Sequence, residues 1–290
     1  KTIPDAAPEL LAQAGRWADR LSVNIELPTQ QGLDRLAPEK SSTSIRRSMA
    51  RLTLAIEDAQ AERRAVRAQP VRLLPGAGRR KAAPPAFAAA GQSTQMIVGA
   101  DGASDATILA TSAQLYGAYR LRRVYYSAFS PIPHAAAALP AQAPPLLREH
   151  RLYQADWLMR FYGFGADEIT PSGQTGMLAL DVDPKLAWAL AHPERFPVDL
   201  NTAPRALLLR VPGLGVRSVD KLLLARRARR LRAADLRALR VSPAKVLPFV
   251  VLADHRPRAG GVERSALAEP RSLASPAAPV HPSSLQAALF

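Results

Sequence analysis

The stretch VDLNTAPRALLLRVPGLGVRSVDKLLLARR (198–227) gives the sharpest fold signal in the sequence. Its spaced leucines and valines predict two short helices, separated by the tight turn VPGLG (211–215). Asn201 or Thr202 is expected to cap the first helix, because their short polar side chains accept hydrogen bonds from free backbone amides. The second helix is expected to begin at Val216. The apolar residues expected to pack these helices together are Leu208, Val211, Leu214, Val219 and Leu222.

The glycines of this turn predict a binding site for an anion. Gly213 and Gly215 permit backbone conformations and close approaches that a Cβ atom would obstruct. Their amides and the start of the second helix form a donor cluster suited to one phosphate, and Arg217 and Lys221 lie one helical turn apart beside it. A plain helix–helix turn is the alternative interpretation. The residues expected to contact nucleic acid are Val211, Gly213, Leu214, Gly215, Arg217, Ser218 and Lys221.

The distribution of charge favours a polyanionic partner. The chain has 39 Lys plus Arg against 24 Asp plus Glu, a formal net charge of +15. Residues 205–245 alone hold 12 Lys and Arg, with only Asp220 and Asp235 as acids. A partner held through its phosphates would be bound without sequence preference and in a salt-sensitive way. DNA is expected, and RNA stays open.

The first half of the chain alternates helical and strand-like segments, which predicts a parallel α/β sheet or barrel. Ser104 or Asp105 is expected to cap one of the helices. One face of another helix, with Leu146, His150, Tyr153, Trp157 and Phe161, is expected to be core. The predicted strands are 20–28, 94–100 and 122–129, and the predicted helices include 5–19, 44–67, 145–162, 184–191, 231–239 and 242–251.

Four parts are expected along the chain. They are an α/β part (1–170), a connecting segment (171–198), the hairpin domain (199–257) and a disordered Ala-, Pro- and Ser-rich tail (258–290). The Pro-rich stretch 70–90 is predicted to be a loop or crossover. No apolar run reaches the roughly 18 residues of a membrane helix, so a cytoplasmic protein without a membrane partner is expected. The start at Lys1 suggests a chain entered partway through a longer product.

Two resemblances extend this interpretation. The stretch 198–227 resembles the helix–hairpin–helix motif of DNA repair and recombination proteins. RLSVNIELPT, AGQSTQMIVGADGASD and LRRVYYSAFSPIP, in that order, resemble the later strands of radical S-adenosylmethionine enzymes. Together they resemble the radical S-adenosylmethionine family assigned to DNA modification or repair, over about residues 1–257. The resemblance implies a partial (β/α) barrel followed by an all-α helix–hairpin–helix domain.

The same resemblance implies cofactors that this chain holds only in part. The family uses a CxxxCxxC motif to bind a [4Fe–4S] cluster, which cleaves S-adenosylmethionine to a radical. The chain has no cysteine, so it cannot hold that cluster, and no metal ligands or catalytic residues are assigned. The expected function is the C-terminal part of such an enzyme, bound to the DNA or RNA backbone. The alternative is a non-enzymatic, sequence-independent DNA-binding protein with a degenerate barrel.

The resemblance also indicates where S-adenosylmethionine would be bound. Asn24 and Glu26 alternate with apolar residues on their strand, and Gly99 offers a bare backbone to an adenine ring. Tyr125 and Tyr126 are expected on opposite faces of theirs. An ordinary solvent-facing strand surface is the alternative. The residues expected to bind the cofactor are Asn24, Glu26, Gln92, Ser93, Gln95, Gly99 and Tyr125.

Overall fold

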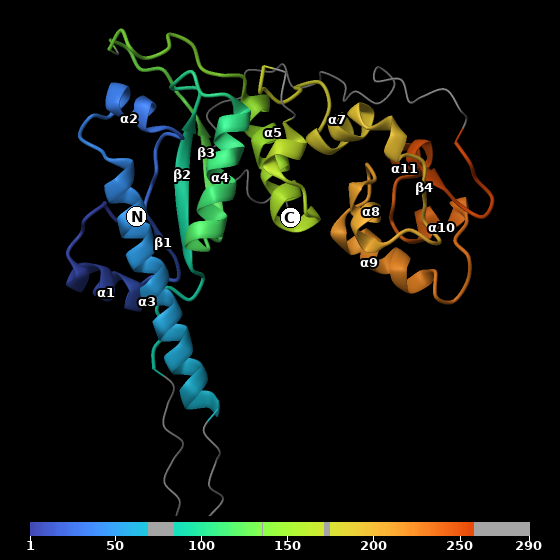
Figure 1. Cartoon of the computed structure of the whole chain (residues 1–290), viewed down its shortest axis with the longest axis horizontal. Helices are drawn as coiled ribbons and strands as arrows, with labels where there is room; N and C mark the ends of the chain where they lie inside the picture. The colour runs from blue at the N-terminus through green and yellow to red at the C-terminus, as the bar shows by residue number, and fades with distance from the viewer. Residues whose placement is uncertain (69–83, 135, 171–174, 258–290) are drawn as a thin grey trace, which may run out of the picture.

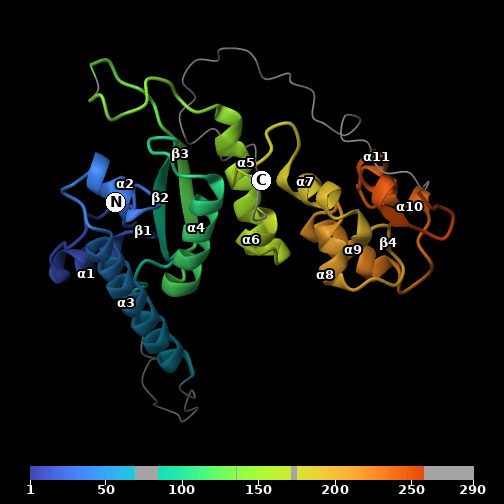
Figure 2. The same cartoon turned by 45° about the horizontal axis from the view of Figure 1, so that its top comes forward.

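The computed structural model describes residues 1–68, 84–134, 136–170 and 175–257 (Figure 1). An α/β unit occupies one end of the molecule, and a small helical unit, residues 198–257, which we call the hairpin unit, occupies the other (Figure 2). The main sheet has three parallel strands in the order β1–β2–β3. The mixed α/β class is therefore confirmed, but the described strands form an open sheet and no barrel.

The α/β unit follows the predicted alternation of strands and helices. Its strands are β1 (Leu21–Ser22), β2 (Gln92–Val98) and β3 (Arg123–Ala128). Its helices are α1 (Pro8–Trp17), α2 (Gln30–Leu36), α3 (Ser42–Ala68), α4 (Asp105–Tyr119) and α5 (Leu146–Trp157). Ser104 is the residue that caps α4, since its hydroxyl accepts a hydrogen bond from the amide of Thr107.

The alternation of residues 20–28 is confirmed by burial. The four apolar side chains face the core, whereas Asn24 and Glu26 are only half-buried. Regular pairing with β2 covers only β1, and the contact resumes at Glu26, whose backbone has φ +65°. The alternation of buried and half-buried residues therefore agrees with the prediction, whereas regular strand pairing covers only part of the predicted length. The buried apolar residues are Leu21, Val23, Ile25 and Leu27.

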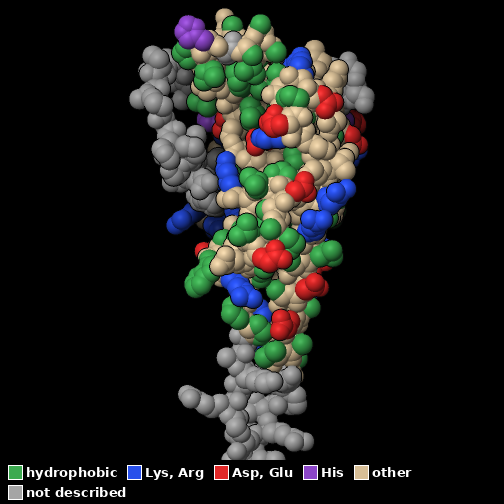
Figure 3. Space-filling view, turned by 90° about the vertical axis from the view of Figure 1, so that its left-hand side faces the viewer, with side chains coloured by type: hydrophobic (Ala, Val, Ile, Leu, Met, Phe, Trp, Pro, Cys, Tyr) green, Lys and Arg blue, Asp and Glu red, His purple; other side chains and the backbone are tan. Residues whose placement is uncertain are grey.

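Helix α3 has two different halves. Its first half packs on the sheet through Ile45, Met49 and Leu52, which are at most 1% exposed. Beyond Ile56, no residue of α3 is buried, and the helix projects from the molecule in Figure 1. On the face drawn in Figure 3, basic and acidic side chains are interspersed rather than gathered by sign. The distal half of α3 is therefore solvated.

The outer edge of β3 is closed by side chains. The amide of Val124 donates to the Tyr116 hydroxyl at 2.9 Å, and the amide of Tyr126 donates to the Tyr153 hydroxyl at 3.0 Å. The amide of Ala128 donates to a carboxylate oxygen of Glu149 at 2.8 Å. Because these groups occupy the donors that a further strand would use, β3 ends the sheet on this side.

The core face of α5 differs from the predicted one. Leu146 and Phe161 are 59% and 48% exposed, and Tyr153 and Trp157 are only half-buried. The prediction failed because three of the residues that α5 buries are charged, and hydrophobic periodicity does not find them. The buried residues of α5 are Arg148, Arg151, Leu152, Ala155 and Asp156.

Those buried charges tie α5 to α4. Arg148 Nε lies 2.7 Å from an oxygen of Asp105, which also accepts from the amide of Leu178. Asp156 accepts a 2.6 Å hydrogen bond from the Tyr116 hydroxyl and pairs with Arg160. Burial raises the pKa of Asp156, an effect that these partners oppose. Both carboxylates are therefore structural, and Asp105 is an ion-pair partner rather than the helix cap considered above.

A short connection leads to the hairpin unit. It consists of a π-helical turn, η1 (Leu158–Tyr162), the helices α6 (Ala166–Ile169) and α7 (Pro184–Ala191), and the 3-10 turn η2 (Pro193–Arg195). The predicted helix 184–191 is thus confirmed. Asp183 caps α7 by accepting hydrogen bonds from the amides of Lys185 and Leu186.

The hairpin unit is two consecutive helical hairpins closed by a pair of short strands. The parallel strands β4 (Val198–Asp199) and β5 (Val250–Val251) join its two ends. The helices are α8 (Arg205–Arg210), α9 (Val216–Ala225), α10 (Ala233–Ala238) and α11 (Pro243–Val246), and the last leads into the turn η3 (Leu247–Phe249). The predicted packing residues are all at most 1% exposed, which confirms Leu208, Val211, Leu214, Val219 and Leu222 as its core.

Asn201 has a different role from the predicted helix cap. Its side chain accepts from the amide of Leu231 at 2.7 Å and donates to the carbonyl of the same residue at 3.3 Å. Helix α8 instead follows Pro204 without a side-chain cap. Asn201 therefore fastens the segment before α8 to the segment before α10.

Two expectations lie mostly or wholly outside the described residues. They concern the predicted loop 70–90, of which only 84–90 is described, and the tail 258–290. Of the helices that the structure describes, none combines the length and the apolar character needed to cross a membrane.

Candidate functional site

The bend of the first hairpin, residues 211–215, has one strained and one relaxed glycine. Gly213 has φ +80°, and a Cβ there would lie 2.9 Å from side-chain atoms of Lys245 and Val246. Gly215 has φ −88° and precedes α9, where its missing side chain leaves the first amides without a side-chain cap. The bend therefore needs glycine at position 213 for its shape, and position 215 leaves the helix start accessible.

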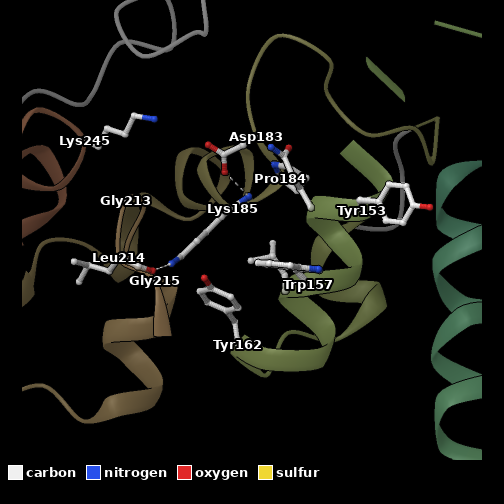
Figure 4. Close-up of a pocket in the computed structure, with 12 residues that line it drawn as sticks. Tyr153, Trp157, Tyr162, Asp183, Pro184, Lys185, Gly213, Leu214, Gly215 and Lys245 are labelled. Carbon is white, nitrogen blue, oxygen red and sulfur yellow. Dashed lines mark hydrogen bonds between the residues drawn. The ribbon is translucent and has the colours of Figure 1, made fainter. Parts of the chain in front are cut away.

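The bend borders a pocket of about 310 Å³ between the α/β unit and the hairpin unit (Figure 4). Helix α5 and η1 provide one wall, the start of α7 lies above, and the bend and α11 lie opposite. The residues that line the pocket are Tyr153, Gln154, Trp157, Leu158, Tyr162, Asp183, Pro184, Lys185, Gly213, Leu214, Gly215 and Lys245.

Lys185 crosses this pocket and holds the bend. Its Nζ donates to the carbonyl oxygen of Leu214 at 2.6 Å, as the dashed line in Figure 4 marks, and lies 4.7 Å from the centre of the Tyr162 ring. Burial lowers the pKa of Lys185 from its usual value to about 7; Asp183 opposes this effect and Arg210 adds to it. Burial therefore destabilises the charged, ammonium form of Lys185, and a negative charge added to the pocket would stabilise that form.

Tyr162 lies beside one of the amides predicted to bind phosphate. Burial raises the pKa of Tyr162, and the backbone amide of Val216, the first residue of α9, opposes that effect. A Cβ at Gly215 would lie 3.6 Å from the hydroxyl oxygen of Tyr162. The bend is thus turned partly toward the pocket, since Gly213 and Gly215 line it, whereas Arg217 is exposed and does not line it.

Arg217 and Lys221 lie as predicted, one turn apart and exposed on α9. Within the described part of the chain, neither of them makes an ion pair. Of the predicted contact residues, Val211 and Leu214 are buried in the hairpin core, so only their backbone can face a ligand.

Among the residues that the structure describes, most cations of segment 205–245 have no acidic partner. Arg205 pairs with Asp220 at 3.0 Å and Arg229 pairs with Asp235, so both acids of the segment are used. Arg210 pairs with Glu168, and Arg226 donates to two backbone carbonyls. The other eight cations are exposed: Arg217, Lys221, Arg227, Arg230, Arg232, Arg237, Arg240 and Lys245.

The residues predicted to bind S-adenosylmethionine lie mostly on one face of the sheet. Strand register places Ser93 beside Ser22 and Gln95 beside Tyr125, on the face of Asn24, which accepts a hydrogen bond from Ser22. Glu26, at φ +65°, pairs one residue out of that register, with Met96. Gln95 donates to Ser127 at 2.9 Å and accepts from Lys1 at 2.8 Å.

Besides Lys1, three further cations contact the residues predicted to bind S-adenosylmethionine. Lys40 lies 3.1 Å from Glu26, Arg20 donates to the Tyr125 hydroxyl at 3.0 Å, and Arg123 lies over the Tyr125 ring. The face therefore offers both donors and acceptors. Tyr126, on the opposite side of β3, is 1% exposed, so the predicted separation of the two tyrosines is confirmed.

Gln92 and Gly99, which were also predicted to bind the cofactor, do not lie on this polar face with free groups. The Gln92 side chain points to the helices, where its amide donates to the carbonyls of Met49 and Tyr119 and to the Thr53 hydroxyl. Gly99 has φ +81°, and a Cβ there would lie 2.8 Å from Pro144. The close approach at Gly99 is thus made by Pro144 of this chain.

Sequence reasoning missed several residues of the pocket. Lys185 and Lys245 stand in helices predicted only as structure, and Trp157 and Tyr162 were assigned to a core face or left unassigned. A lysine two residues after a capping aspartate, in DPKLAWAL (183–190), is the pattern that could have drawn attention to Lys185. Because α5, α7 and the bend are far apart in the sequence, the sequence did not predict that they lie side by side.

No group of three or more metal-ligating side chains occurs among the residues that the structure describes, and the sequence has no cysteine. Comparisons of the chain with protein-family models, with curated proteins and with solved structures found no match. Its function is therefore judged from the geometry of the chain itself.

Proposed function

We propose that this chain binds the sugar–phosphate backbone of DNA, or of RNA, through its hairpin unit, as the C-terminal part of a radical S-adenosylmethionine enzyme that modifies or repairs nucleic acid. The observation that carries the binding proposal is the set of eight exposed cations in segment 205–245, of which Arg217 and Lys221 lie on α9, the helix that begins at the glycine bend. Phosphate contacts of this kind position a backbone and carry no sequence information.

The charge arrangement explains why a polyanion is the preferred partner. The two acids of segment 205–245 are held by arginines, so they do not offset the remaining cations locally. The amides at the start of α9 add fixed partial positive charge, which favours an anion there. Several cations on one small unit release several counterions on binding, which makes the affinity strongly dependent on salt.

The chain fits the two implied cofactors unequally. Without cysteine it has no thiolate for an iron–sulfur cluster, so no radical step is assigned to its residues. The polar face with Asn24, Gln95 and Tyr125 offers donors and acceptors for the amino, carboxylate and ribose groups of S-adenosylmethionine. A non-enzymatic DNA-binding protein is the alternative, and the absence of cysteine favours it for this chain alone.

The double variant Arg217→Ala, Lys221→Ala tests the binding proposal. Fluorescence anisotropy with a labelled oligonucleotide should show weaker binding, and the dependence of log K on log salt should become shallower by about two, since each lost phosphate contact removes about one. Both side chains are exposed, so the thermal unfolding of the variant should match that of the parent chain.

Arg47→Ala, Arg51→Ala is the matched control. These arginines are also exposed and four residues apart, but they lie on α3 in the α/β unit. The control should keep the affinity and the salt dependence of the parent. Equal losses in the two double variants would show that only net charge matters, and would reject the hairpin as the binding site.

A further inference from the structure

The pocket beside the hairpin bend carries chemistry that backbone binding does not use. A phosphate contact needs cations and amides, yet the wall formed by α5 and η1 presents Trp157 and Tyr162 to the pocket (Figure 4). Trp157 is half-buried, with the ring of Phe161 edge-on at 5.8 Å. Flat aromatic surfaces beside a basic groove are the usual means by which proteins hold unpaired bases.

The opposite side of the pocket supplies positive charge and hydrogen-bonding groups. Lys185 is buried, and Lys245 is exposed at the pocket border. Asp183, which caps α7, adds a carboxylate, and Gln154 adds an amide from α5, on the aromatic side; both are groups that can recognise a base edge. One pocket therefore combines an aromatic wall, two cations and polar groups.

The size and position of the pocket limit what it can take. A volume of about 310 Å³ lies at the small end of the range for ligand sites, which is roughly 300–1,000 Å³. Because Gly213 and Gly215 belong both to the pocket wall and to the predicted phosphate site, a nucleotide attached to a phosphate there is next to the opening. A stacked, paired base has its faces covered by its neighbours and cannot meet this wall.

We propose that this pocket accepts one unstacked nucleotide of the strand bound by the hairpin unit, with its base against Trp157 and Tyr162 and its phosphate beside Lys245 and the bend. This inference rests on the proposed backbone binding and adds a substrate class to it. The preferred ligand is single-stranded nucleic acid, or a duplex with an unpaired base, rather than an intact duplex.

The three tryptophans of the chain allow a direct test by fluorescence. Trp17 is 86% exposed on α1, Trp188 is 3% exposed, and Trp157 lines the pocket. With the full 290-residue chain, adding a single-stranded oligonucleotide should quench part of the emission, because a stacked base quenches indole. The quench should disappear in Trp157→Phe and persist in Trp17→Phe.

Affinity provides the second readout. Trp157→Ala should weaken single-strand binding about 5- to 150-fold, which corresponds to the roughly 1–3 kcal/mol lost with one base–aromatic stack. Trp157→Phe, which keeps an aromatic ring and the packing, should lose less. The control Trp17→Ala removes a tryptophan of α1, at the far end of the molecule, and this variant should bind like the parent chain.

The choice of oligonucleotides separates this inference from the proposed function. Single strand and a duplex with one bulged nucleotide should bind more tightly than the matched intact duplex, and a bulge without a base should lose that advantage. If all of them bind equally and Trp157→Ala behaves like Trp17→Ala, the pocket inference is overturned while backbone binding stands. Absence of any salt-sensitive binding would instead overturn the proposed function.

A free nucleotide is the remaining source of the same chemistry. Free deoxyadenosine monophosphate should quench Trp157 only at concentrations well above those of the oligonucleotide, because it lacks the neighbouring phosphates held by α9. Quenching by the free nucleotide at the lower concentration would assign the pocket to a small molecule and reject the proposal.

Discussion

The α/β unit and the hairpin unit use the same charged residue types in opposite ways. In the α/β unit, Arg148 and Asp105 form a pair in which the carboxylate is fully buried, and this pair joins α4 to α5. In the hairpin unit, the ion pair of Arg205 and Asp220 is half-exposed, and most arginines point to solvent. Charged side chains thus stabilise the packing of helices in the α/β unit, whereas in the hairpin unit they are exposed and available to a ligand.

The largest expected effect comes from breaking the buried pair. Asp105→Ala leaves the Arg148 guanidinium buried without its carboxylate and frees the amide of Leu178, which should lower the free energy of unfolding by about 3–5 kcal/mol. Urea unfolding followed by circular dichroism would measure this change.

Asp220→Ala is its counterpart in the hairpin unit. Its partner Arg205 stays hydrated, so the loss should be at most about 1 kcal/mol. Similar losses in the two variants would show that the contrast between the units does not exist.

The next effect concerns the dependence of stability on pH. The pKa of Lys185 is lowered to about 7 in the folded chain, so between pH 7 and 10 the unfolded chain binds a proton that the folded chain does not. The free energy of unfolding should therefore rise with pH in this window, by roughly 1 kcal/mol per pH unit. Thermal unfolding between pH 7.5 and 9.5 would show this rise, and Lys185→Met should reduce it.

The control and the upper limit of that window follow from other residues. Lys221→Met, at an exposed lysine, should leave the pH dependence unchanged. Above pH 10 the trend should reverse, since burial raises the pKa of Tyr153 to about 12 and raises that of Tyr126 as well, and the unfolded chain then loses those protons first. An equal rise in Lys185→Met and the parent would contradict the role of Lys185.

The last effect separates the two glycines of the bend. Gly213→Ala places a Cβ at φ +80° and against Lys245, which should cost about 2 kcal/mol of stability. Gly215→Ala, at φ −88° with its nearest neighbour 3.6 Å away, should fold like the parent chain. Differential scanning calorimetry would resolve the two, and equal melting temperatures would remove the strain argument.

The sequence predicted the elements whose residues alternate or repeat in simple ways. The alternating burial of 20–28, the helix capped by Ser104 and the five core residues of the first hairpin are where periodicity placed them, although the regular strand is limited to Leu21–Ser22. Local chemistry thus predicted the mixed α/β class and the shape of the bend, because each depends on residues close together in the chain.

The sequence did not predict the pairings between distant segments. Hydrophobic periodicity placed Leu146 in the core of α5, since it does not recognise that Arg148 becomes buried once Asp105 neutralises it. Asn201 looks like a helix cap until Leu231, thirty residues further on, lies beside it. The sequence did not predict the pocket for the same reason, because the segments that form it, α5, α7 and the bend, are distant from one another in the chain.

The outer edge of β3 cannot pair with a further strand. With the amides of Val124, Tyr126 and Ala128 already bonded to side chains, an incoming peptide strand finds no free donors there. On the other side, Thr2 already pairs with the backbone beside β1, where its amide donates to the carbonyl of Ser22. Edge-to-edge self-association through β3 is therefore blocked by Tyr116, Tyr153 and Glu149, and at the β1 margin an incoming strand meets the segment that holds Thr2.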